Sequence, residues 1–190
     1  MHVVAGSGLR GLTHRAVDAR AGVPEGTCSA YLRTRLALLT ALTEFVTAQF
    51  AQDIEALTAR IEQHHGEPAY ALRQTGTMLR SWLREPELLL VRMELAIEGS
   101  RQAVLGEIMQ VQFHQLTRVV ERALTPPGAD DAHQRAATLI ASLDGVLLRA
   151  LREPVRTRGV FLARSLELLL VALDGPLHSP GPDPRTQAGH

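Results

Sequence analysis

Apolar residues recur every three or four positions along most of this chain, and few stretches alternate with a period of two. Spacing of three and four places apolar side chains on one face of an α-helix, whereas alternation is typical of a half-buried strand. Thr34 precedes the longest such stretch, where its hydroxyl can cap the first helical turn. The pattern predicts a long amphipathic helix from Arg35 to about Glu62, with an apolar stripe of Leu38, Leu39, Leu42, Phe45, Val46, Ile54, Leu57 and Ile61.

Proline and glycine divide the rest of the chain into further segments with the same periodicity. An all-α fold is therefore expected, with additional helices at 69–84, 87–98, 101–124, 131–151 and 156–174. The breaks between them are Glu85-Pro86, Gly99-Ser100, Thr125-Pro126-Pro127-Gly128 and Glu153-Pro154. Residues 175–190 are rich in Pro and Gly and are expected to form a disordered tail.

The composition excludes several classes of protein. Apolar residues make up 45% and charged residues 21% of the 190 residues, which supports a packed core and excludes disorder throughout. Twenty acidic residues balance twenty Arg, which argues against a basic nucleic-acid coat and an acidic solvating protein but leaves a local basic face open. The single cysteine, Cys28, excludes an internal disulfide framework and fits a reducing compartment.

The chain shows no sequence signal for membrane insertion or secretion. Its longest apolar run, Leu168 to Leu173, is far shorter than the roughly 18 residues that a spanning helix needs. The N-terminus lacks a basic region followed by a long apolar segment, so it does not read as a secretory signal. We therefore expect a cytoplasmic protein without a membrane partner.

The last two predicted helices are apolar around most of their circumference, so each needs a second surface to cover it. In a chain of this size we expect that surface to be a second copy of the chain, which gives a two-fold symmetric homodimer. The alternative is a central core helix within a monomer. The candidate interface residues are Leu139, Leu143, Leu147, Leu162, Leu166, Leu169 and Leu173.

Two short helical segments near the N-terminus are joined by a glycine turn. The first begins after Thr13, a predicted N-cap, and ends at Gly22, and the second runs from Glu25 to about Leu32. The second segment carries small and polar residues, which would let its backbone approach another surface closely. This arrangement is typical of the helix-turn-helix unit, whose second helix enters the major groove of DNA.

The stretch from Gly8 to Leu39 resembles the DNA-binding domain of the tetracycline-repressor (TetR) family of bacterial transcriptional regulators. The resemblance is carried by four segments in the family's order, which are Gly8-Leu9-Arg10-Gly11-Leu12-Thr13, Ala21-Gly22-Val23-Pro24-Glu25-Gly26-Thr27, Ser29-Ala30-Tyr31-Leu32-Arg33-Thr34-Arg35 and Ala37-Leu38-Leu39. The remaining chain is similar to the family only in its helical architecture.

The resemblance implies a DNA-binding domain over 1–45 and a helical effector-binding and dimerisation domain over 46–174. It also implies a homodimer whose two recognition helices read operator half-sites on the order of 34–36 Å apart. In the family, a small molecule bound in the second domain releases the DNA. These features together imply a ligand-responsive repressor that binds a palindromic operator.

The chain departs from the family pattern in three places. The first helix of the family is longer, so this chain is expected to begin inside that helix and to lack its first turns. Leu36 stands where the family usually has Glu, and Ser29 stands where it usually has an aromatic residue. The last two departures bear on the target sequence more than on the fold.

The helix-turn-helix region supplies the candidate DNA contacts. Arg33 and Arg35 are expected to hold phosphates, and the Thr13 amide and hydroxyl can meet a phosphate at a helix N-terminus. Tyr31 is expected to pack in the core with its hydroxyl on a phosphate, and Glu25 to stabilise a helix start. The candidate residues are Thr13, His14, Arg15, Glu25, Gly26, Thr27, Ser29, Ala30, Tyr31, Arg33 and Arg35.

Methionine and aromatic residues on inward helical faces are candidates for lining an apolar effector pocket. They are Phe45, Met78, Trp82, Met93, Met109 and Phe113, with Gln49, Gln112, His114 and Asp144 as candidate polar contacts. For any one of the apolar residues, ordinary core packing is the simpler interpretation. The effector itself is expected to be a largely apolar small molecule.

Other clusters support competing functions only weakly. Cys28 could sense redox state, although no second cysteine is present to resolve an oxidised thiol. His64-His65 and the pair Glu94 and Glu98 could suggest a metal or acid–base site in an all-helical enzyme or cofactor protein. Ion pairing of the two Glu with Arg92 or Arg101 explains them better. We therefore expect no catalytic residues, metal or cofactor, and a helical dimer that has lost DNA binding is the remaining alternative.

Overall fold

The computed structural model describes residues 1–64, 67–124 and 131–174, and within these ranges every regular element is an α-helix. The predicted all-α class is therefore confirmed. The predicted tail at 175–190 lies outside the described residues. The helices are α1 (His2–Gly11), α2 (His14–Ala21), α3 (Thr27–Tyr31), α4 (Arg35–Gln63), α5 (Pro68–Arg84), α6 (Pro86–Gly99), α7 (Ala103–Leu124), α8 (Ala132–Leu151) and α9 (Val155–Asp174).

The helix ends follow local chemistry that the sequence already displays. Thr34 caps α4, because its hydroxyl oxygen accepts a hydrogen bond from the Ala37 amide. Pro68 and Pro86 stand at the first positions of α5 and α6, where a proline lacks only an amide that would have no helical partner. The predicted bounds of the five later helices agree with the structure to within about two residues.

The first helix is present over His2–Gly11 and is kinked at Gly8. Gly8 has a φ of 66° and a ψ of 179°, a combination that side chains other than glycine rarely adopt. Val4 is 1% exposed, so the turn before the kink is anchored in the core. The N-terminal segment therefore folds as part of the domain.

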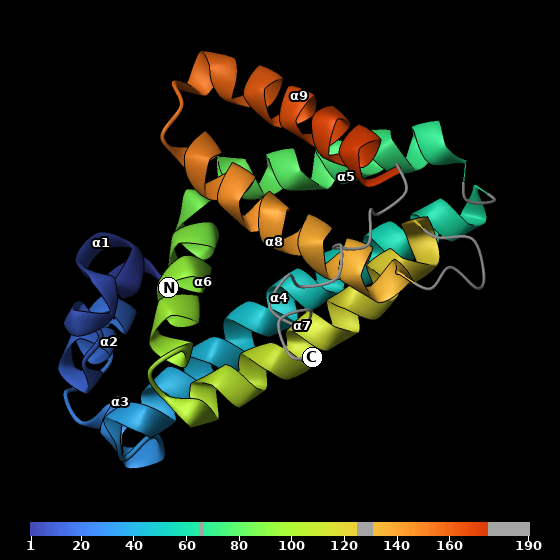
Figure 1. Ribbon diagram of the computed structural model, residues 1–190. Helices are drawn as coiled ribbons and strands as arrows, with labels where there is room; N and C mark the ends of the chain where they lie inside the picture. The colour runs from blue at the N-terminus through green and yellow to red at the C-terminus, as the bar shows by residue number, and fades with distance from the viewer. Residues whose placement is uncertain (65–66, 125–130, 175–190) are drawn as a thin grey trace, which may run out of the picture.

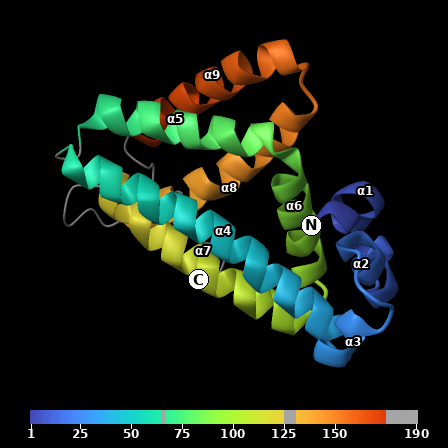
Figure 2. The same ribbon diagram turned by 180° about the vertical axis from the view of Figure 1, so that it is seen from behind.

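The helices form a small head and a larger body that meet along α6 (Figures 1 and 2). Helices α1, α2 and α3 gather on one side, and both views show α6 between α1 and the rest of the body. The long helices α4 and α7 lie side by side, and α8 packs against both α7 and α9. Helix α6 contacts the head through α1 and the body through α4, α5, α7 and α8.

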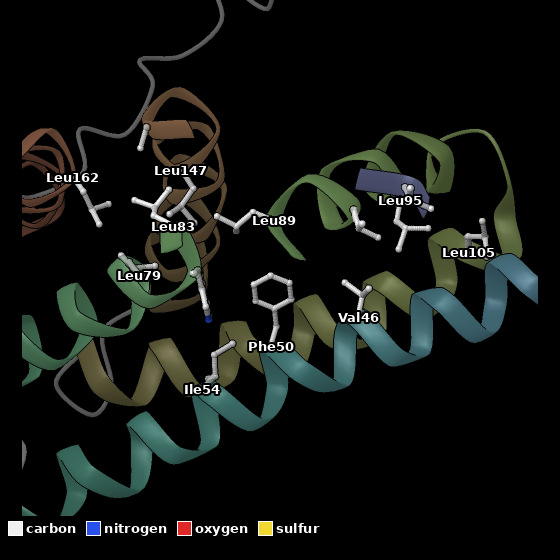
Figure 3. Packing of buried hydrophobic residues seen from close by; sticks show 14 of the residues in the cluster. Val46, Phe50, Ile54, Leu79, Leu83, Leu89, Leu95, Leu105, Leu147 and Leu162 are labelled. Carbon is white, nitrogen blue, oxygen red and sulfur yellow. The ribbon is translucent and has the colours of Figure 1, made fainter. Parts of the chain in front are cut away.

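Leucines and two aromatic residues fill the space between these helices (Figure 3). Phe50 on α4 meets Trp82 on α5 edge to face, with ring centroids 4.7 Å apart. The Trp82 Nε1 donates a hydrogen bond to an Asp53 carboxylate oxygen over 2.6 Å, so its polar end is satisfied. The core also contains the fully buried leucines Leu89, Leu95, Leu105, Leu147 and Leu162.

Four residues predicted at a dimer interface instead belong to the core of a single chain. Leu139, Leu147, Leu162 and Leu166 are each at most 5% exposed. They are already covered by neighbouring helices of the same chain, so the expectation that they need a second copy is wrong. Leu143 and Leu169 are half-buried, and the side chain of Leu173 lies outside what the structure describes.

The apolar character of α9 is nevertheless two-sided, as its sequence indicates. Leu162 and Leu166 face the core, whereas Val160, Leu168 and Val171 are 56%, 71% and 75% exposed. These three exposed residues are eight and three positions apart and form one stripe along the helix. The surplus apolar surface is real, but it consists of different residues from those predicted.

Two glycines allow α6 and α7 to cross closely. A Cβ placed on Gly106 would lie 2.8 Å from the carbonyl oxygen of Gly99, and a Cβ on Gly99 would lie 3.4 Å from the Gly106 backbone. A side chain at position 106 therefore has to push the end of α6 away. Among the described residues, no helix has both the length and the apolar character needed to cross a membrane.

We expect Gly106→Ala to lower the free energy of unfolding by about 1–3 kcal/mol, since the added methyl group overpacks a backbone contact. Urea unfolding monitored by circular dichroism measures this change. Gly145→Ala is the matched control, because a Cβ there meets nothing within 4 Å and should stabilise α8 by about 0.5–1 kcal/mol. Equal effects of the two substitutions would contradict the close crossing.

Candidate DNA-binding head and effector cavity

Helix α2 is capped at both ends. The Thr13 hydroxyl accepts a hydrogen bond from the Ala16 amide over 3.1 Å and caps α2, as the sequence predicts. Gly22 then ends α2 in the left-handed conformation with a φ of 68°, which glycine adopts without strain. The reversal at Gly22 turns the chain toward α3, which begins at Thr27.

Asp18 fixes the position of α3 against α2. Its side chain is buried in the head, and its carboxylate accepts hydrogen bonds from the amides of Gly26 over 2.8 Å and Cys28 over 2.7 Å. These amides belong to the N-terminal end of α3, where a helix lacks internal partners and favours negative charge. Asp18 was not among the predicted site residues, although a lone acidic residue on an inward face of α2 was a usable signal.

Helix α3 presents a small polar surface with one large exposed ring. The Thr27 hydroxyl donates to the Pro24 carbonyl over 2.7 Å, and the Ser29 hydroxyl donates to the Gly26 carbonyl over 2.9 Å. Ala30 is exposed. Tyr31 is 85% exposed, so the prediction that its ring packs in the core is wrong. The ring lies where it can meet an external partner.

The basic residues around α3 differ in how far they are free to bind another molecule. Arg15 is 82% exposed and its Nε lies 3.7 Å from the carboxylate of Glu25, which is also exposed. Arg33 is exposed directly after α3. His14 is half-buried, and its Nε2 is buried without a hydrogen-bond partner in the described part of the chain.

Arg35 has a structural role that the sequence did not reveal. Its Nη1 donates to the Leu12 carbonyl and its Nη2 to the Leu9 carbonyl, each over 2.7 Å. These carbonyls end α1, so the guanidinium joins the start of α4 to the end of α1. The predicted phosphate role of Arg35 therefore has to compete with this internal bonding.

Cys28 does not have the surroundings of a reactive thiol. Burial, and secondarily the negative charge of Asp18, raises the pKa of the Cys28 thiol above its usual value. The thiolate is the form that oxidants attack, so a raised pKa makes the side chain less reactive. The geometry favours the packing role over the redox role.

A cavity of about 400 Å³ lies in the body between α4, α6, α7 and α8. Two of the six apolar residues predicted to line an effector pocket, Met109 and Phe113, do line it. Trp82, Met78 and Met93 do not, since Trp82 and Met78 belong to the core around Phe50. Phe45 is 49% exposed and is also not among the lining residues, so these four residues do not line this cavity.

Phe50 lines the cavity in place of Phe45. Positions 46, 50, 54 and 57 share one face of α4, and all four are buried, whereas position 45 is turned about 100° away. The helical spacing of Val46 and Ile54 was the signal that could have identified Phe50. Among the polar candidates, Asp144 lines the cavity.

The cavity wall contains an ion pair between α6 and α8. The Arg92 Nη1 and Nη2 donate to the two carboxylate oxygens of Asp144, the Nη2 contact being 3.0 Å. Glu98 lies 3.8 Å from Arg101, as predicted. Glu94 does not pair with Arg92 as expected, because it accepts a hydrogen bond from the Leu9 amide over 2.6 Å.

The bond between Glu94 and Leu9 joins the body to the head. A Cβ on Gly8 would lie 3.3 Å from the Glu94 carboxylate, so glycine at this kink lets the carboxylate approach the backbone of α1. Helix α6 therefore carries Arg92 in the cavity wall and Glu94 in the head contact, two residues apart. A movement of α6 therefore changes both the cavity wall and the contact with the head.

The histidines do not form a metal site within the described residues. His64 stacks on Tyr70 with ring centroids 3.7 Å apart, and its Nδ1 lies 3.0 Å from the Arg60 carbonyl oxygen. His65 lies outside the described residues. Across residues 1–64, 67–124 and 131–174, no group of three or more His, Cys, Asp or Glu is arranged to hold a metal ion.

The helix-turn-helix head on a helical body with a cavity is the architecture of a one-component transcriptional regulator. Residues 66–176 match the family model described as Tetracyclin repressor-like, C-terminal domain. The chain belongs to the tetracycline-repressor family of transcriptional regulators. This is a family of regulators rather than enzymes, in agreement with the expectation that the chain has no catalytic activity.

Three solved structures have a similar fold. A transcriptional regulator from Rhodococcus sp. Rha1 is 24% identical over 90% of both chains, with a TM-score of 0.75. A TetR-family regulator from Mesorhizobium loti is 17% identical over 90% of this chain and 91% of its own, with a TM-score of 0.68. Another TetR-family regulator, from Rhodococcus sp., is 18% identical over 88% of this chain and 92% of its own, with a TM-score of 0.62. No curated protein matches the chain.

We expect Asp18→Ala to destabilise the head by about 1–3 kcal/mol, because two amides at the start of α3 lose their acceptor. Amide hydrogen exchange measures this change. The exchange rate should increase at Gly26 and Cys28 and stay unchanged in α8. Glu25→Ala is the control, since Glu25 is exposed and accepts no such bond. Unchanged exchange at Gly26 would show that Asp18 does not position α3.

Proposed function

We propose that the chain is a ligand-responsive homodimeric repressor that binds a palindromic operator in double-stranded DNA. The observation that carries this proposal is the surface of α3. Ala30 and Tyr31 are exposed there, and the exposed guanidinium groups of Arg15 and Arg33 flank them. A small polar helix between positive charges suits the major groove and its phosphate borders.

Each side chain on this surface has a chemical counterpart on DNA. The Ala30 methyl group suits the methyl group of thymine, and the hydroxyls of Thr27 and Ser29 retain acceptor capacity after donating to backbone carbonyls. The exposed Tyr31 hydroxyl suits a phosphate or a base edge. Arg15, Arg33 and the N-terminal end of α2 at Thr13 supply attraction to the backbone.

The cavity supports a role for a small-molecule effector. Its volume of about 400 Å³ falls within the range of small-molecule sites. Helix α6 contributes Arg92, Ala96 and Gly99 to the lining and Glu94 to the contact with Leu9. A ligand that shifts α6 therefore changes the position of the head, which is the physical basis for release of DNA.

The exposed apolar stripe of α9 supports a homodimer. Val160, Leu168 and Val171 are more than half exposed, and Leu148 on the neighbouring α8 is 47% exposed. A second copy related by a two-fold axis would cover this surface with the same residues. It would also place two heads side by side, which suits two half-sites of a palindrome.

We expect Arg33→Ala to weaken binding to operator and scrambled duplexes by the same factor, since a phosphate contact carries no sequence information. The slope of log affinity against log salt should fall by about one per subunit. Fluorescence anisotropy with a duplex selected from a random-sequence pool measures both quantities. Ser29→Ala should instead change the ratio of the affinity for the operator duplex to the affinity for the scrambled duplex.

Arg60→Ala is the control for this experiment, because Arg60 is an exposed residue in the last turn of α4, away from α3. A loss of affinity for Arg60→Ala equal to that for Arg33→Ala would contradict the assigned surface. If the unaltered chain binds no duplex at low salt, the repressor proposal fails. The chain would then be a helical dimer that has lost DNA binding.

We expect Leu168→Glu to raise the dimer dissociation constant by about a hundredfold or more, because it places carboxylates in an apolar interface. Sedimentation equilibrium measures the constant. Glu107→Gln is the control, since Glu107 is exposed on α7 and does not belong to α9. If Leu168→Glu leaves the dimer dissociation constant unchanged, the interface does not include this stripe.

A further inference from the structure

The described residues that line the cavity include more acidic than basic side chains. Of the described residues, Arg92 on α6, Asp144 on α8 and Glu55 on α4 contribute charged side chains to the lining. Among these described residues, a bound molecule meets one guanidinium and two carboxylates. The described part of the lining therefore carries an excess of negative charge before any ligand arrives.

The guanidinium of Arg92 is already engaged by protein groups. Both terminal nitrogens of Arg92 donate to Asp144, and its Cζ lies 5.2 Å from the centroid of the Phe50 ring. Only 19% of the Arg92 side chain is exposed. The two bonds to Asp144 leave three Arg92 N–H donors, but an anionic ligand that accepts from them would lie close to the Asp144 carboxylate, which is electrostatically unfavourable.

The carboxylates, in contrast, keep unused acceptor capacity. The hydrogen bonds from Arg92 occupy one position on each Asp144 oxygen, whereas an ionised carboxyl group offers about four acceptor positions. The Asp144 side chain is 36% exposed, so the remaining positions are accessible. Glu55 is exposed on another wall of the cavity.

The rest of the lining is largely apolar, with two aromatic rings. It includes Phe50, Ile54, Met109, Phe113, Leu116 and Val119. Arg92 lies over the Phe50 ring, which also packs edge to face with Trp82, whereas Phe113 is on α7. Met109 can adapt to the shape of a bound ring system.

We propose that the effector is an organic cation, an amine with an aromatic or otherwise apolar body. This inference rests on the proposed function of the cavity as the effector site. The ammonium group donates to Asp144, Glu55 adds electrostatic attraction, and the apolar body packs against Met109 and Phe113. An ammonium group at Asp144 also competes with Arg92 for the carboxylate. Its binding therefore weakens the ion pair that joins α6 to α8.

Three naphthalene derivatives of matched size test the sign of the charge on the full chain. They are naphthylmethylamine, naphthylmethanol and naphthoate, which carry a cation, a neutral hydroxyl and an anion. Isothermal titration calorimetry should show the amine binding about tenfold more tightly than the alcohol, because a hydrogen bond between charged groups is stronger than a neutral one. The carboxylate should bind more weakly than the alcohol.

Asp144→Asn is the decisive variant, because it keeps the shape of the side chain and removes its charge. It leaves Arg92 without a counter-charge, so the preference should reverse and naphthoate should bind more tightly than the amine. Glu55→Gln should weaken the amine alone, by a smaller factor. Glu107→Gln is the matched control, since Glu107 is exposed on α7 outside the cavity lining and should change nothing.

Folding and location are checked separately. Each variant should keep the helical circular dichroism spectrum of the unaltered chain, and Glu107→Gln should also keep its DNA affinity without ligand. Ala51→Phe fills the cavity from α4 and should reduce binding of all three compounds. Equal binding of the three compounds, tightest binding of naphthoate, or failure of the amine to bind at millimolar concentration overturns the cation inference.

The outcomes for this inference and for the proposed function are distinct. If naphthoate or the alcohol binds more tightly, loses affinity in Ala51→Phe and still releases DNA, the cavity is the effector site and the cation inference alone fails. If the unaltered chain does not bind DNA, the repressor proposal fails while the calorimetric ranking of the three compounds still decides the ligand class.

Discussion

The burial of α6 on several sides is the constraint on which the rest of the structure depends. Leu89, Val91 and Leu95 on this helix are at most 1% exposed, because α1 covers one side and the helices of the body cover the others. A helix held in this way cannot move without repacking its neighbours, since protein interiors are close-packed and not continuously deformable. Head and body are therefore mechanically joined.

Polar contacts order the head, and one of them holds it to α6. Its buried apolar residues are few, and a small core gives limited stability. Three charged side chains add directed bonds, because Asp18 holds the start of α3, Arg35 holds the end of α1 and Glu94 holds Leu9. Such bonds fix orientation, which a surface that reads DNA requires.

The sequence predicted the helical elements well and the functional side chains unevenly. Caps at Thr13 and Thr34 and breaks at proline act within a few residues, so the chain itself shows where helices begin and end. Exposure of Tyr31 and the inward position of Phe50 depend on how helices rotate against their neighbours. Local periodicity leaves that rotation uncertain by about one residue, or 100°.

The sequence by itself determined the all-helical class, the turn at Gly22, the family resemblance and the two-sided apolar character of α9, because each depends on residue type and short spacing. Only the tertiary structure decided which apolar residues are covered, that Arg35 bonds to α1, and that Arg92 meets Asp144 across 52 positions. The physical reason is that side-chain partners far apart in the chain are chosen by packing, and no local pattern records that choice.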